Sequence, residues 1–154
     1  MNYNKTLVAV VTSLILITIL LATCNSSKED GLWHAIESIG ITCIDGKLVD
    51  SEDAIRIICD QPSSCCEDCP TFLTIYKSDE SFASGSETGA EMFETFGMAD
   101  LFQVFPDKRV TMQNTFCTLG HLAIPQSEVL LYVATVSEWL NANGYLGNVP
   151  TSAP

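Results

Sequence analysis

Residues 63–76 read SSCCEDCPTFLTIY, a run in which a cluster of cysteines leads directly into threonine, isoleucine and aromatic residues. β-Branched and aromatic side chains pack well on a pleated surface, so residues 71–76 are predicted to form a strand. Cys65, Cys66 and Cys69 come just before it. If the cysteine cluster is extended, Cys65 and Cys66 point to opposite sides and reach different partners. The cluster is therefore predicted to be a junction, at which disulfides tie Cys43, Cys59 and Cys117 to the loop that carries these three cysteines.

The residues before this run predict a helix and a hairpin. Residues 31–39, GLWHAIESI, place apolar side chains at helical spacing. In residues 41–50, ITCIDGKLVD, an Asp-Gly pair separates two short apolar runs, a pattern typical of a two-residue hairpin turn. This hairpin places Cys43 on a strand. Residues 54–58 fit either a helix capped by the residues before them or a buried strand, and both interpretations remain open.

The residues that follow the cysteine run predict a loop and then a helix. Residues 77–87, KSDESFASGSE, are rich in serine, glycine and acid, which is typical of a loop. Thr88 and Glu91 have the spacing of a capping box, in which each side chain bonds a free backbone N–H at the start of a helix. A helix is therefore predicted over residues 89–97.

The last third of the chain predicts two strands and a long helix. Residues 101–105 and 109–119 are predicted strands that flank a turn at Pro106-Asp107. Ser127 is expected to cap a helix over residues 128–143, which the Asn143-Gly144 pair ends. The fold class is therefore α+β: a small disulfide-stapled domain with short β-hairpins and a C-terminal helix.

An apolar segment at the N-terminus predicts attachment to a membrane. Leu7–Cys24 holds eighteen residues without a charge, and as a helix it would span about 27 Å, just enough to cross a bilayer. Lys5 precedes it, which favours an orientation with the C-terminal domain outside the cytoplasm. A signal-anchor is the main interpretation. A cleaved signal peptide, which would make the protein secreted, and a lipoprotein signal that acylates Cys24 are the alternatives. A buried helix of a soluble domain is disfavoured, because so apolar a segment does not fit inside a small domain.

These segments define the expected domain organisation. It consists of a signal-anchor or transmembrane segment (1–24), a polar spacer (25–30), a cysteine-rich extracytoplasmic domain (31–147) and a flexible tail (148–154).

Composition excludes several kinds of partner. The chain carries 19 acidic against 7 basic residues, a net charge of −12, so a phosphate backbone would be repelled and nucleic-acid binding is not expected. Its acidic clusters lack the alternating oxygen ligands and central glycine of a calcium loop. The chain contains no G-x-S-x-G, P-loop or H-E-x-x-H motif, so we expect neither an enzyme nor a cofactor.

The cysteines admit three kinds of chemistry. Cys66 and Cys69 form a C-x-x-C pair, which in a thiol-disulfide oxidoreductase opens a helix; here two acids separate them and a strand follows. A tetrahedral metal site could use Cys66, Cys69, Cys117 and His121, although the two halves lie far apart in the chain. We favour a disulfide framework, which suits a small domain outside the cytoplasm. The cysteines available for it are Cys43, Cys59, Cys65, Cys66, Cys69 and Cys117.

The final helix is apolar around most of its circumference, so it is either central in its own core or covered by another molecule. The aromatic Tyr132 and Trp139 are candidate anchors for a partner, because aromatic residues are common hot spots. The full set of interface candidates is Tyr132, Val136, Trp139 and Leu140. We therefore expect a membrane-anchored structural or interaction protein, a subunit of a cell-surface or virion-like assembly. A membrane-tethered oxidoreductase and a secreted or lipidated binding protein are the alternatives.

Overall fold

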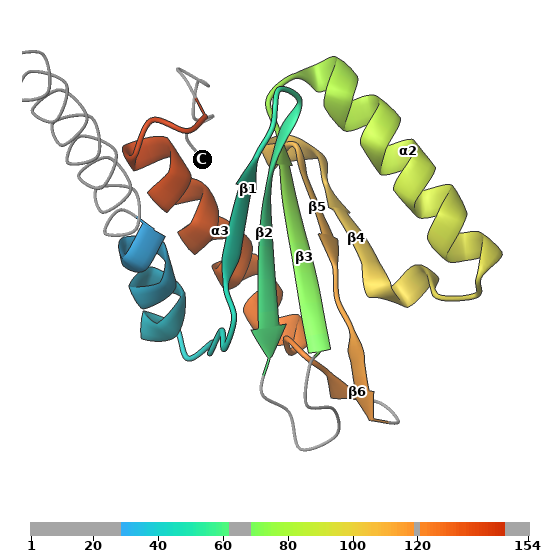
Figure 1. Cartoon of the computed structure of the whole chain (residues 1–154). Helices are drawn as coiled ribbons and strands as arrows, with labels where there is room; N and C mark the ends of the chain where they lie inside the picture. Colours follow the sequence, from blue (N-terminus) through green and yellow to red (C-terminus); the bar gives the residue numbers. More distant parts are fainter. Residues whose placement is uncertain (1–28, 62–68, 119–120, 147–154) are drawn as a thin grey trace, which may run out of the picture. The chain divides into compact units, whose positions relative to one another are not determined.

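A computed structural model describes residues 29–61, 69–118 and 121–146 (Figure 1). The chain divides into two units, Met1–Leu32 and Trp33–Pro154, and the second holds all the described strands. Residues 29–38 are helical. The elements that follow are β1 (Lys47–Asp50), β2 (Ala54–Gln61), β3 (Cys69–Tyr76), α2 (Asp79–Thr95), η1 (Ala99–Leu101), β4 (Phe102–Phe105), η2 (Pro106–Lys108), β5 (Val110–Gln113), β6 (Phe116–Thr118), β7 (His121–Leu122) and α3 (Gln126–Ala142).

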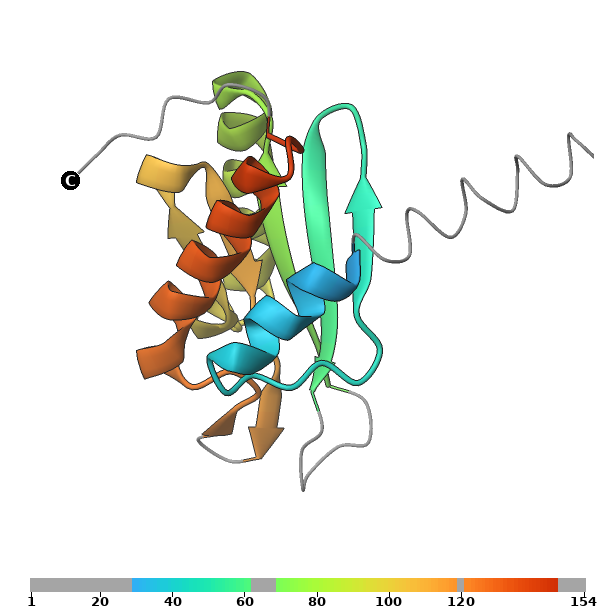
Figure 2. The same cartoon turned by 90° about the vertical axis from the view of Figure 1, so that its left-hand side faces the viewer.

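The domain is α+β, as predicted, and is built on a five-stranded sheet in which all neighbours are antiparallel. The strand order is β1-β2-β3-β5-β4, so the strand predicted from TFLTIY is central. Strands β6 and β7 form a separate two-stranded hairpin. Helix α3 lies on one face of the large sheet and α2 on the other (Figures 1 and 2).

The face of the sheet beneath α3 carries the hydrophobic core. Strand pairing places Ile57 opposite Leu73, and Leu73 opposite Met112, so alternate residues of β2, β3 and β5 point to this side. These side chains and those on the inner side of α3 are fully buried, and burial of this kind contributes roughly 1.5 to 3 kcal/mol for each large residue. The residues buried on these elements are Ile55, Ile57, Cys59, Leu73, Ile75, Val110, Met112, Val129, Tyr132, Val133, Val136 and Leu140.

The opposite face of the sheet holds aromatic rings against α2. The Phe93 and Phe102 rings stack with centroids 5.2 Å apart, and Tyr76 meets Phe82 edge to face at 5.7 Å. Two glycines of α2 let the helix approach these rings. A Cβ at Gly85 would collide with the Tyr76 ring, and a Cβ at Gly89 would collide with the Phe102 ring. The glycines are therefore a packing requirement of this face.

Helix α2 corrects the predicted loop over residues 77–87. It begins at Asp79, ten residues before the predicted start, and the Ser78 hydroxyl caps it by accepting a hydrogen bond from the Ser81 N–H at 3.1 Å. The negative side chains of Asp79 and Glu80 in the first turn interact favourably with the positive end of the helix dipole. Serine and glycine are poor helix formers, but here the cap and the close contact with the sheet outweigh their propensity.

The predicted Asp-Gly hairpin is also wrong. Residues 41–46 form no strand, so Cys43 lies in a loop, and β1 starts after Gly46 and pairs with β2. The turn between β1 and β2 lies instead around Ser51, whose hydroxyl accepts a hydrogen bond from the Ala54 N–H at 3.2 Å. Gly46 serves another purpose, since a Cβ there would lie 2.6 Å from the Trp33 ring. Of the two interpretations of residues 54–58, the strand is correct.

The predictions for the last third are largely confirmed. The predicted strands over 101–105 and 109–119 appear as β4 and as β5 with β6, joined through the 3₁₀ turn η2. Helix α3 starts at Gln126 with Pro125 as its N-cap, so Ser127 lies inside the helix and does not cap it. The predicted end is confirmed, because Asn143 is the C-cap and Gly144 follows with φ of +79°.

None of the described helices is both long enough and apolar enough to cross a membrane. The predicted signal-anchor, Leu7–Cys24, falls outside the described residues, as does the predicted tail over 148–154.

Candidate functional site

The structure contains a disulfide between Cys43 and Cys59, with their Cα atoms 5.1 Å apart. The Ile44 N–H donates to the Asp60 carbonyl at 2.9 Å, which holds the loop that carries Cys43 beside the end of β2. This pairing corrects the predicted junction, in which both cysteines would bond to the cluster at 65–69. The two sulfurs meet because the loop folds back on β2.

The other cysteines lie outside the part of the chain whose side chains are described. Cys24, Cys65 and Cys66 are not described, and Cys69 and Cys117 are described only as backbone positions in β3 and β6. The Thr115 hydroxyl donates to the Pro70 carbonyl at 2.6 Å, so the chain entering β6 lies beside the start of β3. The disulfide framework for these cysteines stays a prediction, as does the C-x-x-C pair.

The predicted metal site falls largely on the same residues. The side chains of Cys69, Cys117 and His121 are not described, and Cys66 is not described at all. Among the residues that are described, no group of three or more His, Cys, Asp or Glu side chains is arranged to hold a metal ion.

Three of the four interface candidates on the last helix lie in the core. Tyr132, Val136 and Leu140 have no exposed surface, so a partner at the surface of this fold does not reach them. Trp139 is half-buried and stacks on Tyr145 with centroids 5.7 Å apart. These three residues therefore belong to the core of the domain, and Trp139 alone stays a candidate for contact with a partner.

The Tyr132 hydroxyl is buried and has no hydrogen-bond partner among the described residues. Burial raises the pKa of this phenol above its ordinary value of about 10, because the charged form is poorly solvated in the core. A buried hydroxyl without a partner lowers stability. The free energy of unfolding of the Tyr132→Phe variant is therefore expected to be about 1 kcal/mol higher than that of the wild type. The matched control is Tyr76→Phe, which removes a hydroxyl that lies 3.3 Å from the Thr111 hydroxyl and should lower stability slightly.

Urea unfolding at pH 7 measures both variants. The wild type should also lose stability as the pH rises above about 10, because the unfolded chain then releases the Tyr132 proton and the folded chain keeps it. The Tyr132→Phe variant should lack that part of the pH dependence. A clear loss of stability in Tyr132→Phe would mean that the hydroxyl has a partner and would reject this assignment.

Several large apolar side chains at the end of α2, on β4 and on β6 are exposed. Phe96 is 69% exposed, and Met92 and Met98 are each about half exposed. Val104 on β4 and Phe116 on β6 are exposed as well. The Met98 N–H donates to the Phe93 carbonyl at 2.8 Å, which turns the chain from α2 into η1 and then into β4. We call these five residues, Met92, Phe96, Met98, Val104 and Phe116, the α2–β4 surface.

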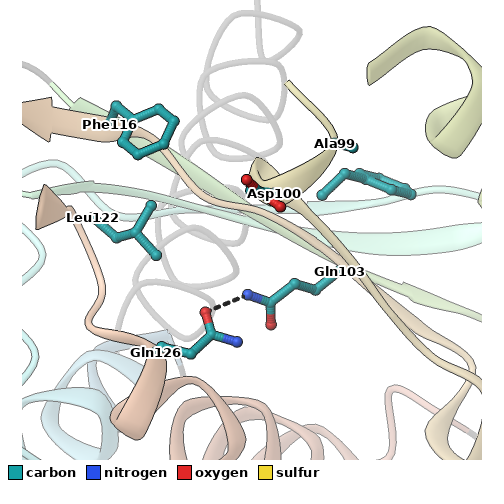
Figure 3. A pocket seen from close by; sticks show the side chains of 7 residues that line it. Ala99, Asp100, Gln103, Phe116, Leu122 and Gln126 are labelled. Atoms are coloured by element: carbon teal, nitrogen blue, oxygen red, sulfur yellow. Dashed lines mark hydrogen bonds between the residues drawn. The ribbon is translucent and has the colours of Figure 1, made fainter. Parts of the chain in front are cut away.

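A pocket of about 540 Å³ opens next to this surface (Figure 3). The Gln103 side chain on β4 donates to the Gln126 side chain at the start of α3 across 2.8 Å. The Asp100 carboxylate lines the pocket and takes part in none of the ion pairs among the described residues. The complete lining is Ala99, Asp100, Phe102, Gln103, Phe116, Leu122 and Gln126.

The chemistry of this pocket suits binding. Its lining offers one carboxylate, two carboxamides and apolar side chains, and it includes no serine, cysteine, histidine or lysine. A carboxylate can accept hydrogen bonds from a cation, carboxamides can bond a peptide backbone, and aromatic rings can cover apolar groups. Phe116 belongs both to this pocket and to the α2–β4 surface, and we treat the two together as the candidate binding region.

Sequence reasoning did not identify this region. The helix predicted over residues 89–97 contains the large apolar residues Met92, Phe93 and Phe96, and of these only Phe93 is buried. The residues that face the sheet are Phe82, Gly85, Gly89 and Phe93, and the glycines in this row carry no hydrophobic signal. Met92 falls outside this row, whereas Phe96 has the spacing of the row but lies at the C-cap of the helix and stays exposed.

Comparison with known proteins adds no relative: no protein-family model, no curated protein and no solved structure matches the chain.

Proposed function

We propose that the protein is a disulfide-stabilised interaction module, held outside the cytoplasm by its N-terminal segment, and that it works as a subunit of a larger assembly at a cell surface or in a virion-like particle. The observation that carries this proposal is the α2–β4 surface, above all Phe96, an aromatic side chain that is 69% exposed. Large aromatic residues dominate the binding energy of many protein interfaces.

The energetics of this surface favour a partner. Full burial of a phenylalanine or methionine side chain contributes roughly 1.5 to 3 kcal/mol, and the α2–β4 surface exposes two of each kind. Methionine is flexible and adapts to irregular partners, which suits an interface. The net charge of −12 keeps such a chain soluble, so the apolar region need not be hidden inside the fold.

The two alternatives find less support. For the oxidoreductase, Cys66 and Cys69 offer no described side-chain geometry, so no observation favours it. The secreted or lipidated binding protein differs only in how the chain is attached, through loss of the leader or acylation of Cys24. It would use the same α2–β4 surface.

The size of the complex that contains the native chain tests the proposal. The full chain is extracted with a mild detergent from the cells that express it and separated by size. The wild type should migrate in an assembly larger than the 16.7 kDa chain in its micelle. The Phe96→Ser, Met98→Ser variant should migrate as the free chain, because it loses roughly 2 to 3 kcal/mol of apolar contact with the partner, while both positions are exposed enough for the fold to tolerate the change.

The matched control is Leu130→Ser, Leu131→Ser. These two leucines of α3 are 64% and 51% exposed and lie outside the α2–β4 surface, so their variant should stay in the assembly. A wild-type chain that migrates alone would reject the proposal. An assembly that survives the Phe96, Met98 change but not the leucine change would place the interface on α3.

A further inference from the structure

The two edges of the large sheet differ in a way that bears on binding. Strand β1 forms one edge, and charged residues stand at both its ends, Lys47 and Asp50. Charges on an edge strand oppose pairing with another chain. Strand β4 forms the other edge and reads FQVF, without a charge or a proline. Among the described strands β4 has a neighbour on one side only, so its outer edge is open to pairing.

The surroundings of β4 differ between the two faces of the sheet. Pairing with β5 places Phe102 and Val104 on the side of α2, where the Phe102 ring stacks on Phe93, three residues before the exposed Phe96. Gln103 lies on the opposite side, where it bonds Gln126 and lines the pocket that holds Asp100. A strand added along β4 would alternate its side chains between these two environments.

The charge decides which kind of segment fits. The pocket contains Asp100, which forms no ion pair with another described residue, and Glu128 in the first turn of α3 offsets the positive end of that helix. A second copy of this chain would bring another net charge of −12 to the same edge, which disfavours self-pairing. A lysine or arginine that reaches the pocket would form a charge-assisted hydrogen bond with Asp100.

We propose that β4 accepts an extended segment of a partner protein as a sixth strand, in which apolar side chains facing Val104 and Phe96 alternate with a lysine or arginine that contacts Asp100. This inference rests on the proposed function and specifies its partner. The backbone of the added strand pairs with the outer edge of β4, so main-chain hydrogen bonds provide affinity and the two side-chain environments provide specificity. Four residues of β4 offer about 13 Å for this pairing.

A peptide selection tests the proposal without knowledge of the natural partner. Phage that display random twelve-residue peptides are panned against the full chain in detergent, with the Phe96→Ser, Met98→Ser variant as the counter-target. The selected sequences should alternate apolar residues with lysine or arginine and lack proline in the central positions. The consensus peptide is then synthesised and its affinity measured, together with a version N-methylated on alternate residues.

Three results are expected. Asp100→Asn should weaken binding of the consensus peptide about tenfold, the equivalent of one lost charge-assisted bond, whereas Asp107→Asn in η2, beyond the far end of β4, should change it little. N-methylation on the residues that pair with β4 should abolish binding, because it removes main-chain donors. Hydrogen exchange of the full chain should show new protection at the amides of Phe102–Phe105 when the peptide binds.

The contrary outcomes separate the two proposals. If peptides bind through Phe96 and Met98 but resist N-methylation and leave β4 unprotected, strand addition is overturned and the proposed interaction function stands. Protection of β4 by self-association of the chain alone would also overturn this inference, in favour of a second copy. Peptides selected equally well by the wild type and the counter-target would overturn both.

Discussion

Loss of the Cys43–Cys59 disulfide is expected to lower the free energy of unfolding by about 3 kcal/mol, the largest expected effect on stability of any change considered for this chain. The bond closes a loop with a sequence separation of 16 residues, and constraint of a loop of this size in the unfolded chain accounts for that magnitude. The pair also holds the loop before β1 against the end of β2, where Cys59 is fully buried. Both the unfolded and the folded state therefore change when the bond is removed.

The test is the double variant Cys43→Ser, Cys59→Ala. Its thermal midpoint should fall by roughly 10 °C in calorimetry, as expected for about 3 kcal/mol in a domain of this size. The control is Thr42→Ser, an exposed change next to Cys43 that leaves the disulfide in place and should leave the midpoint unchanged. A double variant as stable as the wild type would mean that the bond does not constrain the fold.

Replacement of Gly89 by alanine should destabilise the domain by about 1 to 3 kcal/mol, although in most helices this change stabilises by up to about 1 kcal/mol. The new methyl group would collide with the Phe102 ring. That ring cannot yield freely, because it stacks on Phe93. The cost of displacing two packed rings exceeds the gain in helix propensity.

Chemical denaturation of Gly89→Ala and of Thr88→Ala distinguishes packing from propensity. Thr88 is exposed on α2, so its replacement by alanine should leave stability unchanged or raise it slightly. If Gly89→Ala were also stabilising, α2 would not pack closely on the sheet, and the assignment of this face would be wrong.

The strands were predictable where apolar and β-branched residues dominate. TFLTIY is recognisable as a strand from its composition, and the structure makes it the centre of the sheet. The Asp45-Gly46 pair led to the prediction of a hairpin that is not formed. Glycine is needed at position 46 because the Trp33 ring lies too close for a side chain there. Helix α2 was half missed, because its start depends on the Ser78 cap and on contacts with a sheet formed by distant strands.

The candidate site was less predictable than the fold. The α2–β4 surface draws on residues from α2, the turn that follows it, β4 and β6, and no local pattern indicates that these segments share a surface. The apolar character of α3 suggested an interface at Tyr132, Val136 and Leu140, but the same pattern is produced by a helix that covers a sheet. Hydrophobic periodicity identifies a buried face without telling what buries it.

Site-specific photo-crosslinking from position 96 tests the central claim, that the protein acts through the α2–β4 surface. The photoreactive p-benzoylphenylalanine is placed at Phe96 in the full chain, in the cells that express the protein, and in a second strain at Leu131, an exposed position on α3. The proposed function predicts a discrete adduct of defined mass from position 96 and none from position 131. Adducts from position 131 alone, or none from either position, would contradict it.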